Sequence, residues 1–138
     1  MQPETLPLVF CLLLVGGLFL GMAHMGEKRT LRRNGLIGVR LASTMQSDAA
    51  WYAAHKAIAP TLRVCGWAQI IGAAVLLALE SMTESEGTTV LTGLAFLMIP
   101  TLVLVFVSAT RVSTIANEAH QAWEKEREAA ASPSTDNR

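Results

Sequence analysis

Charged residues are scarce in this chain: aspartate, glutamate, lysine and arginine make up 16% of its 138 residues, whereas about a quarter is typical of a soluble domain. The formal net charge at pH 7 is zero, so the chain as a whole lacks the basic character that nucleic-acid binding requires. The charges are also clustered, and long segments between the clusters contain none. This distribution indicates a membrane protein rather than a nucleic-acid-binding one.

Groups that could hold a metal ion or form a disulfide are few. Cys11 and Cys65 both lie in uncharged segments, where a thiol behaves as a small apolar group, and their spacing predicts neither a disulfide nor a metal site. His24, His55 and His120 are scattered without the spacing of metal ligands. The chain also lacks a nucleophile near a base, a phosphate-binding glycine loop and a carboxylate pair. We therefore expect no cofactor, no metal and no enzymatic activity.

Three long uncharged segments predict an all-α integral membrane protein. A helix needs about 20 mostly apolar residues to cross roughly 30 Å of hydrocarbon. The second segment is the shortest, and it reaches this length if Arg63 and Glu80 lie at the two interfaces. A soluble helical core is the alternative, but three such segments leave too little polar surface to cover them. We expect spans at about residues 5–26, 63–82 and 88–110.

The first segment could also be a secretory signal peptide. However, residues 1–4 contain no lysine or arginine, and residues 21–24 offer no cleavage site with two small residues. A retained anchor is therefore expected, within a single membrane domain over residues 1–131. Alanine and glutamate favour a helical tail at 111–131, and residues 132–138 are expected to be disordered.

The positions of lysine and arginine predict the orientation of the spans. Seven of the eleven lie between residues 27 and 63, and the other four follow residue 110. The hairpin between the second and third spans has none and instead carries Glu80, Glu84 and Glu86. Because basic loops stay on the cytoplasmic side, we expect the loop 27–62 and the tail in the cytoplasm and the N-terminus outside.

Small and polar residues inside the spans indicate how the helices pack. Gly17 and Gly21, four residues apart, expose backbone on one face of the first span, and Gly72 offers a similar surface on the second. Either the spans of one chain pack there, or this surface joins two copies. Gln69 is expected to face another helix, because an unpaired amide in hydrocarbon is unfavourable. Pro100 predicts a kink in the third span.

The loop 27–62 contains the signal for a further helix. Ser47 is a plausible N-cap, and Pro60 marks an expected end. Between them Trp51 and His55 lie four residues apart, on one face. Since tryptophan favours the head-group layer, we expect a short interfacial helix on the cytoplasmic membrane surface.

The same loop resembles the SdpI family of bacterial membrane proteins. The family pattern is an asparagine, then Ile-Gly-hydrophobic-Arg, a threonine four residues after that arginine, a serine with an acid, a tryptophan, and a histidine four residues on. This chain matches it without a gap at Asn34, Ile37, Gly38, Val39, Arg40, Thr44, Ser47, Asp48, Trp51 and His55. It departs after the arginine, where family members often have Thr-Pro-Trp. Better-known members also carry additional transmembrane helices, so this chain resembles the minimal domain.

The resemblance implies a bacterial plasma-membrane protein that protects its own cell from a membrane-active peptide toxin and docks a cytoplasmic regulator. It also implies binding roles for Asn34, Gly38, Arg40, Thr44, Trp51 and His55. An alternative of a different class is a small accessory subunit of a larger membrane complex.

The residues alone leave two of these roles open. The guanidinium of Arg40 suits a carboxylate or a phosphate, but its charge could equally serve only to orient the spans. His55 could titrate near neutral pH, although a hydrogen-bonding role is the stronger expectation.

Overall fold

The computed structural model describes residues 5–82 and 86–131, without the side chains of residues 86–89 and 109. Every regular element in these ranges is helical, in the order α1 (Thr5–Glu27), α2 (Asp48–Met82), α3 (Glu86–Val107), the π-helical turn η1 (Ser108–Val112) and α4 (Ser113–Ala131). The expected all-α fold is confirmed for the described residues. Glu84 and the expected disordered tail at 132–138 lie outside them.

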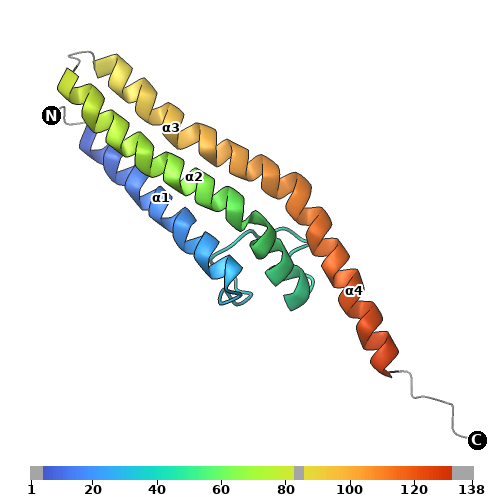
Figure 1. Ribbon diagram of the computed structural model, residues 1–138. Coiled ribbons are helices and arrows are strands. Elements are labelled where there is room, and N and C mark those ends of the chain that lie inside the picture. Colours follow the sequence, from blue (N-terminus) through green and yellow to red (C-terminus); the bar gives the residue numbers. More distant parts are fainter. Residues whose placement is uncertain (1–4, 83–85, 132–138) are drawn as a thin grey trace, which may run out of the picture.

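Helices α1 and α3 both pack along α2 and also contact each other. The start of α1, the end of α2 and the start of α3 lie at one end of this bundle (Figure 1). At the opposite end, α1 leads into the loop of residues 28–47, and α4 follows α3 through η1 and extends beyond the bundle (Figure 1).

The described residues contain three helical stretches long and apolar enough to cross a membrane, Thr5–Glu27, Asp48–Met82 and Val90–Ala131. Large apolar side chains point outwards on them, among them Phe10, Leu18, Ile71 and Phe106, each more than half exposed. Such a surface is unfavourable in water and natural in lipid. The expectation of three apolar spans is confirmed.

The buried side chains form two clusters along the bundle. One joins Val9 and Leu12 of α1 to Ala73 and Leu76 of α2. The other lies nearer the loop end and brings together residues of α1, α2, α3, η1 and α4. Within this second cluster Ala116 of α4 is fully buried, so α4 is held against the start of α2.

Helices α1 and α2 approach each other closely at a pair of glycines. A Cβ atom on Gly16 would lie 2.9 Å from the carbonyl oxygen of Gly66, and one on Gly66 would lie 3.0 Å from the oxygen of Gly16. By contrast, a Cβ on Gly17 or Gly21 would meet nothing within 4 Å. The expectation that Gly17 and Gly21 pack against another span of the same chain is therefore wrong. Successive residues of a helix lie about 100° apart around its axis. Gly16 therefore faces α2, whereas Gly17 and Gly21 lie on the outer face of α1.

Helix α3 packs on α2 through one aromatic ring and two hydrogen bonds. A Cβ on Gly72 would lie 2.6 Å from the ring of Phe96, which occupies the space beside this glycine. Gln69 is fully buried, and its Nε2 donates a hydrogen bond to the carbonyl oxygen of Leu97 at 3.1 Å. One turn away along α2, the thiol of Cys65 lies 3.3 Å from the carbonyl oxygen of Pro100.

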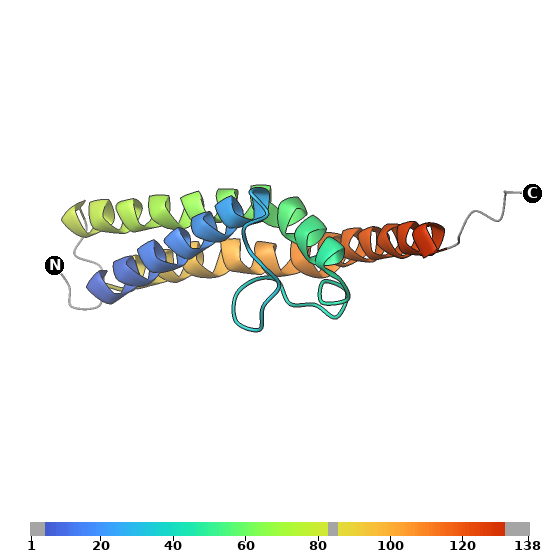
Figure 2. The ribbon, with the colours of Figure 1, turned by 90° about the horizontal axis from the view of Figure 1, so that it is seen from below.

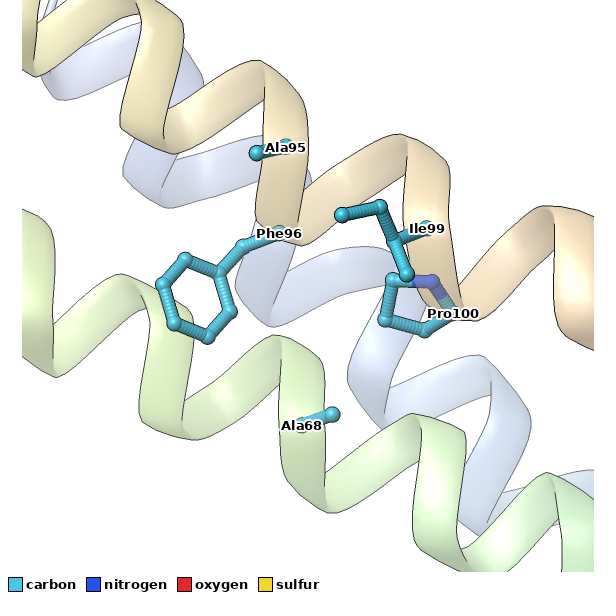
Figure 3. A pocket seen from close by; sticks show the side chains of 5 residues that line it. All are labelled: Ala68, Ala95, Phe96, Ile99 and Pro100. Carbon is cyan, nitrogen blue, oxygen red and sulfur yellow. The ribbon is translucent and has the colours of Figure 1, made fainter.

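A small apolar cavity of about 190 Å³ lies between α2 and α3 beside this proline. Figure 3 shows its lining, with Ala68 on α2 facing Phe96 and Pro100 on α3. The lining offers no titratable or nucleophilic side chain. This cavity therefore has no groups for chemistry.

The expected short helix ending at Pro60 is wrong as a separate element. Helix α2 runs unbroken from Asp48 to Met82 with this proline inside it. A proline within a helix costs about 3 kcal/mol, because it removes one hydrogen bond and crowds the preceding turn. Burial of Ile58, Ala59 and Leu62, each at most 1% exposed, offsets that cost on both sides of the proline.

Candidate functional site

The loop of residues 28–47 lies over the first turns of α2 and covers two aromatic side chains. Trp51 is 0% exposed and His55 is 1% exposed, so the expectation that the ring of Trp51 faces the head-group layer is wrong. The indole Nε1 of Trp51 donates a hydrogen bond to the carbonyl oxygen of Leu31 at 2.8 Å. The tryptophan therefore holds the start of the loop against α2.

His55 holds the middle of the loop. Its Nε2 lies 2.9 Å from the backbone nitrogen of Val39, and its Nδ1 lies 2.8 Å from the carbonyl oxygen of Trp51. Since the amide of Val39 is a donor, Nε2 is the acceptor, and the proton of a neutral ring is on Nδ1. Burial lowers the pKa of His55, and the bond to Trp51 opposes this shift. Both ring nitrogens therefore take part in hydrogen bonds, and the neutral ring has its proton on Nδ1.

Gly38 allows the loop to reach these two side chains. Its φ is 121°, in the region that side chains rarely adopt, and a Cβ there would lie 2.5 Å from Nε2 of His55 and 2.8 Å from the ring of Trp51. Only glycine satisfies both the backbone angle and the close approach. The glycine of the family pattern is explained by this contact.

Thr44 fixes the backbone on both sides of Arg40. Its side chain is fully buried. The hydroxyl accepts a hydrogen bond from the amide of Leu41 at 3.0 Å and lies 2.8 Å from the carbonyl oxygen of Val39, to which it can donate. Because Val39 is also bound to His55, the residues before and after the arginine are both held in place.

Asn34 shapes the tip of the loop. Its Oδ1 accepts hydrogen bonds from the amides of Leu36 and Ile37, both at 2.8 Å, and its Nδ2 donates to the carbonyl oxygen of Arg32 at 2.8 Å. This asparagine therefore satisfies backbone groups in a tight turn, which is a common role for the residue.

One ion pair attaches the loop to α2, and a second joins α1 to α2 beside it. Arg33 contacts Asp48 at 3.0 Å and donates to the carbonyl oxygen of Met45 at 2.8 Å. Arg63 of α2 pairs with Glu27 at the end of α1. The N-cap expected at Ser47 is confirmed, since its Oγ accepts a hydrogen bond from the amide of Ala50 at 3.2 Å.

Arg40 differs from these paired arginines. Its side chain is exposed, and within residues 5–82 and 86–131 it has no hydrogen bond or ion pair. The backbone around it is nevertheless fixed by Thr44 and His55. The fold thus presents a guanidinium, a rigid fork of donors suited to a carboxylate or a phosphate, at a defined position and without an internal partner.

The residues expected in the site divide into three groups in the structure. Gly38, Thr44, Trp51 and His55 form the clamp, Asn34 forms the tip, and Arg40 projects from the clamp. Sequence reasoning missed the backbone partners of the clamp, and it missed the pairing of Arg33, because a basic residue in a basic loop carries no signal of its own. The described residues contain no cluster of potential metal ligands.

A family model described as the SdpI/YfhL protein family matches residues 30–108. This range is more than half of the chain, and it includes the clamped loop and helices α2 and α3. The chain belongs to the SdpI/YfhL family. No curated protein and no solved structure matches the chain. The clamp contains four of the ten residues on which the resemblance to this family rested, and the other six lie in the same loop or at the first residue of α2. The family pattern therefore corresponds here to one folded unit.

Proposed function

We propose that this SdpI/YfhL-family protein is an immunity and signalling protein of the bacterial plasma membrane. In this role it protects its cell from a membrane-active peptide toxin and holds a soluble regulator at the cytoplasmic surface. The observation that carries the proposal is Arg40, an unpaired guanidinium on a backbone held by the clamp. The proposed role is binding, without catalysis.

The proposal places the loop and α4 in the cytoplasm and the N-terminus outside. Arg33 pairs with Asp48, and Arg63 pairs with Glu27. Within residues 5–82 and 86–131, the other basic residues of the loop make no ion pair and leave a positive surface: Lys28, Arg29, Arg32 and Arg40. Lysine and arginine near the ends of spans favour the cytoplasmic side. The same surface would attract an acidic segment of a regulator.

Replacing Arg40 by lysine tests this site directly. Lysine keeps the charge and therefore the orientation signal, but it loses the planar fork. Because a hydrogen bond to a charged group contributes about 1.5–3 kcal/mol, we expect the variant to bind its partner about tenfold or more weakly. Survival of cells challenged with a membrane-active peptide should fall, while the amount of protein in the membrane is unchanged.

Arg32→Lys is the matched control, because Arg32 is an exposed arginine of the same loop outside the clamp. It should protect cells as well as the parent chain does. If Arg40→Lys also protects fully, Arg40 serves only to orient the spans, and the proposed site is wrong.

A second candidate function, an accessory subunit of a larger membrane complex, is favoured by helix α4. Of its 19 residues only Ala116 is buried, and it extends beyond the bundle (Figure 1). Purification in mild detergent distinguishes the two functions: an accessory subunit would elute with other membrane proteins at fixed stoichiometry and would leave survival unchanged when deleted.

A further inference from the structure

An apolar groove of about 580 Å³ runs along the outer face of α1 and is bounded at one end by the tip of the loop. The groove passes over Gly17 and Gly21, where a Cβ atom would meet nothing within 4 Å. Leu36 and Ile37 of the tip line its end. Figure 2 shows the loop extending to one side of the helices, between the end of α1 and the start of α2.

The tip of the loop exposes apolar side chains, as a segment in contact with lipid does. Leu36 is 91% exposed and Ile37 is 51% exposed. The amides of both residues are bound to Oδ1 of Asn34, so the tip presents apolar side chains while these backbone donors are satisfied internally. Hydrocarbon requires this combination, because a backbone group without a partner there costs several kcal/mol.

A free cation lies at the end of the groove nearest the loop. Groove residues follow one face of α1 in steps of four and three, at Leu14, Leu18, Gly21 and Met25. The next step is Lys28, whose amide still bonds to the carbonyl oxygen of His24 at 3.2 Å and so continues the helical path. Its side chain is exposed and makes no ion pair or hydrogen bond within the described residues.

We propose that this groove holds an acyl chain of an anionic phospholipid from the leaflet on the loop side, with the headgroup phosphate against Lys28. A phosphate neutralises the cation, and an acyl chain covers the apolar groove. A second copy of the chain is the less favourable occupant. Parallel packing through Gly17 and Gly21 would bring two basic loops together, and like charges at an interface oppose association.

Native mass spectrometry of the full chain in mild detergent tests the proposal, with phosphatidylglycerol or phosphatidylcholine added as the probe. We expect the parent to retain phosphatidylglycerol preferentially. Lys28→Gln should lower this preference about fivefold, the contribution expected of one basic residue near an anionic surface, and should leave retention of phosphatidylcholine unchanged. The double variant Gly17→Leu/Gly21→Leu should lose both lipids, because its side chains fill the groove.

Cys11→Leu is the control, since Cys11 is exposed on α1 and does not line the groove; it should retain lipid as the parent does. Equal retention by the parent and the double glycine variant would overturn the proposal. So would a dimeric parent that the glycine variant converts to a monomer, because the occupant would then be a second copy. Neither result depends on the immunity assay, so this proposal can fail independently of the proposed function.

Discussion

At the scale of single residues, the clamp depends on one lone pair of His55. The nitrogen Nε2 accepts the amide of Val39 only when the ring is neutral. Protonation would place a second N–H opposite that amide and remove the acceptor. The loop is therefore attached to α2 through a group whose charge can change near physiological pH.

The pH dependence follows from the lowered pKa of His55. Above about pH 6.5, the ordinary pKa of histidine, the ring is neutral in both the folded and the unfolded loop, and the clamp is at full strength. As pH falls below that value the unfolded form binds the proton first, so the clamp weakens until the folded pKa is passed. After correction for the intrinsic slowing of exchange at lower pH, the protection of the Val39 amide should fall between pH 7.5 and 5. His55→Gln should lack this pH-dependent loss of protection.

Gly38 gives a second test at this scale. In Gly38→Ala the alanine would have a positive φ, and its Cβ would lie 2.5 Å from Nε2 of His55. The strained backbone alone costs about 1–3 kcal/mol. We expect trypsin to cleave the loop faster in this variant. Gly35→Ala is the matched control, because a Cβ at Gly35 meets nothing within 4 Å. If the two variants are cleaved at the same rate, the loop is not clamped as described.

At the scale of the helices, two adjacent glycines should respond oppositely to the same change. Gly16→Ala would place its Cβ 2.9 Å from a carbonyl oxygen of α2, and overpacking typically costs about 1–3 kcal/mol. Gly17→Ala adds a methyl group in open space, and alanine is favoured over glycine in a helix by about 1 kcal/mol. In detergent the first variant should melt below the parent and the second at or above it. The reverse order would mean that α1 is rotated about its axis.

Some elements could be predicted from the sequence, and the reasons are physical. Charge is excluded from hydrocarbon whatever the packing, so the three apolar spans could be predicted from composition. Whether a helix ends at Pro60 could not be predicted, because the burial of side chains on both sides of the proline decides whether the helix continues. The spacing of Gly17 and Gly21 was visible too, but not the face on which they lie.

The candidate site was predictable only in part for a similar reason. The family pattern picked out residues that the structure brings together in one unit, including His55 and Trp51. Their partners are the amide of Val39 and the carbonyl of Leu31, and backbone groups carry no signature in the sequence. The pattern therefore indicated a functional surface where the structure has a buried clamp, with Arg40 as the exposed residue.

At the scale of the whole molecule, the clamped loop lies at one end of the bundle, and the end of α2 and the start of α3 lie at the other (Figure 1). A protein that crosses the membrane three times must expose these ends on different sides. The loop end must be cytoplasmic for the proposed function, because a regulator could not otherwise reach Arg40.

Labelling of single cysteines in intact cells tests this claim most directly. Gly35→Cys and Met82→Cys place a thiol at exposed positions at the two ends, in a background in which Cys11 and Cys65 are replaced. We predict that an impermeant thiol reagent labels position 82 in intact cells and labels position 35 only after the cells are lysed. Labelling of position 35 from outside, with position 82 protected until lysis, would contradict the account.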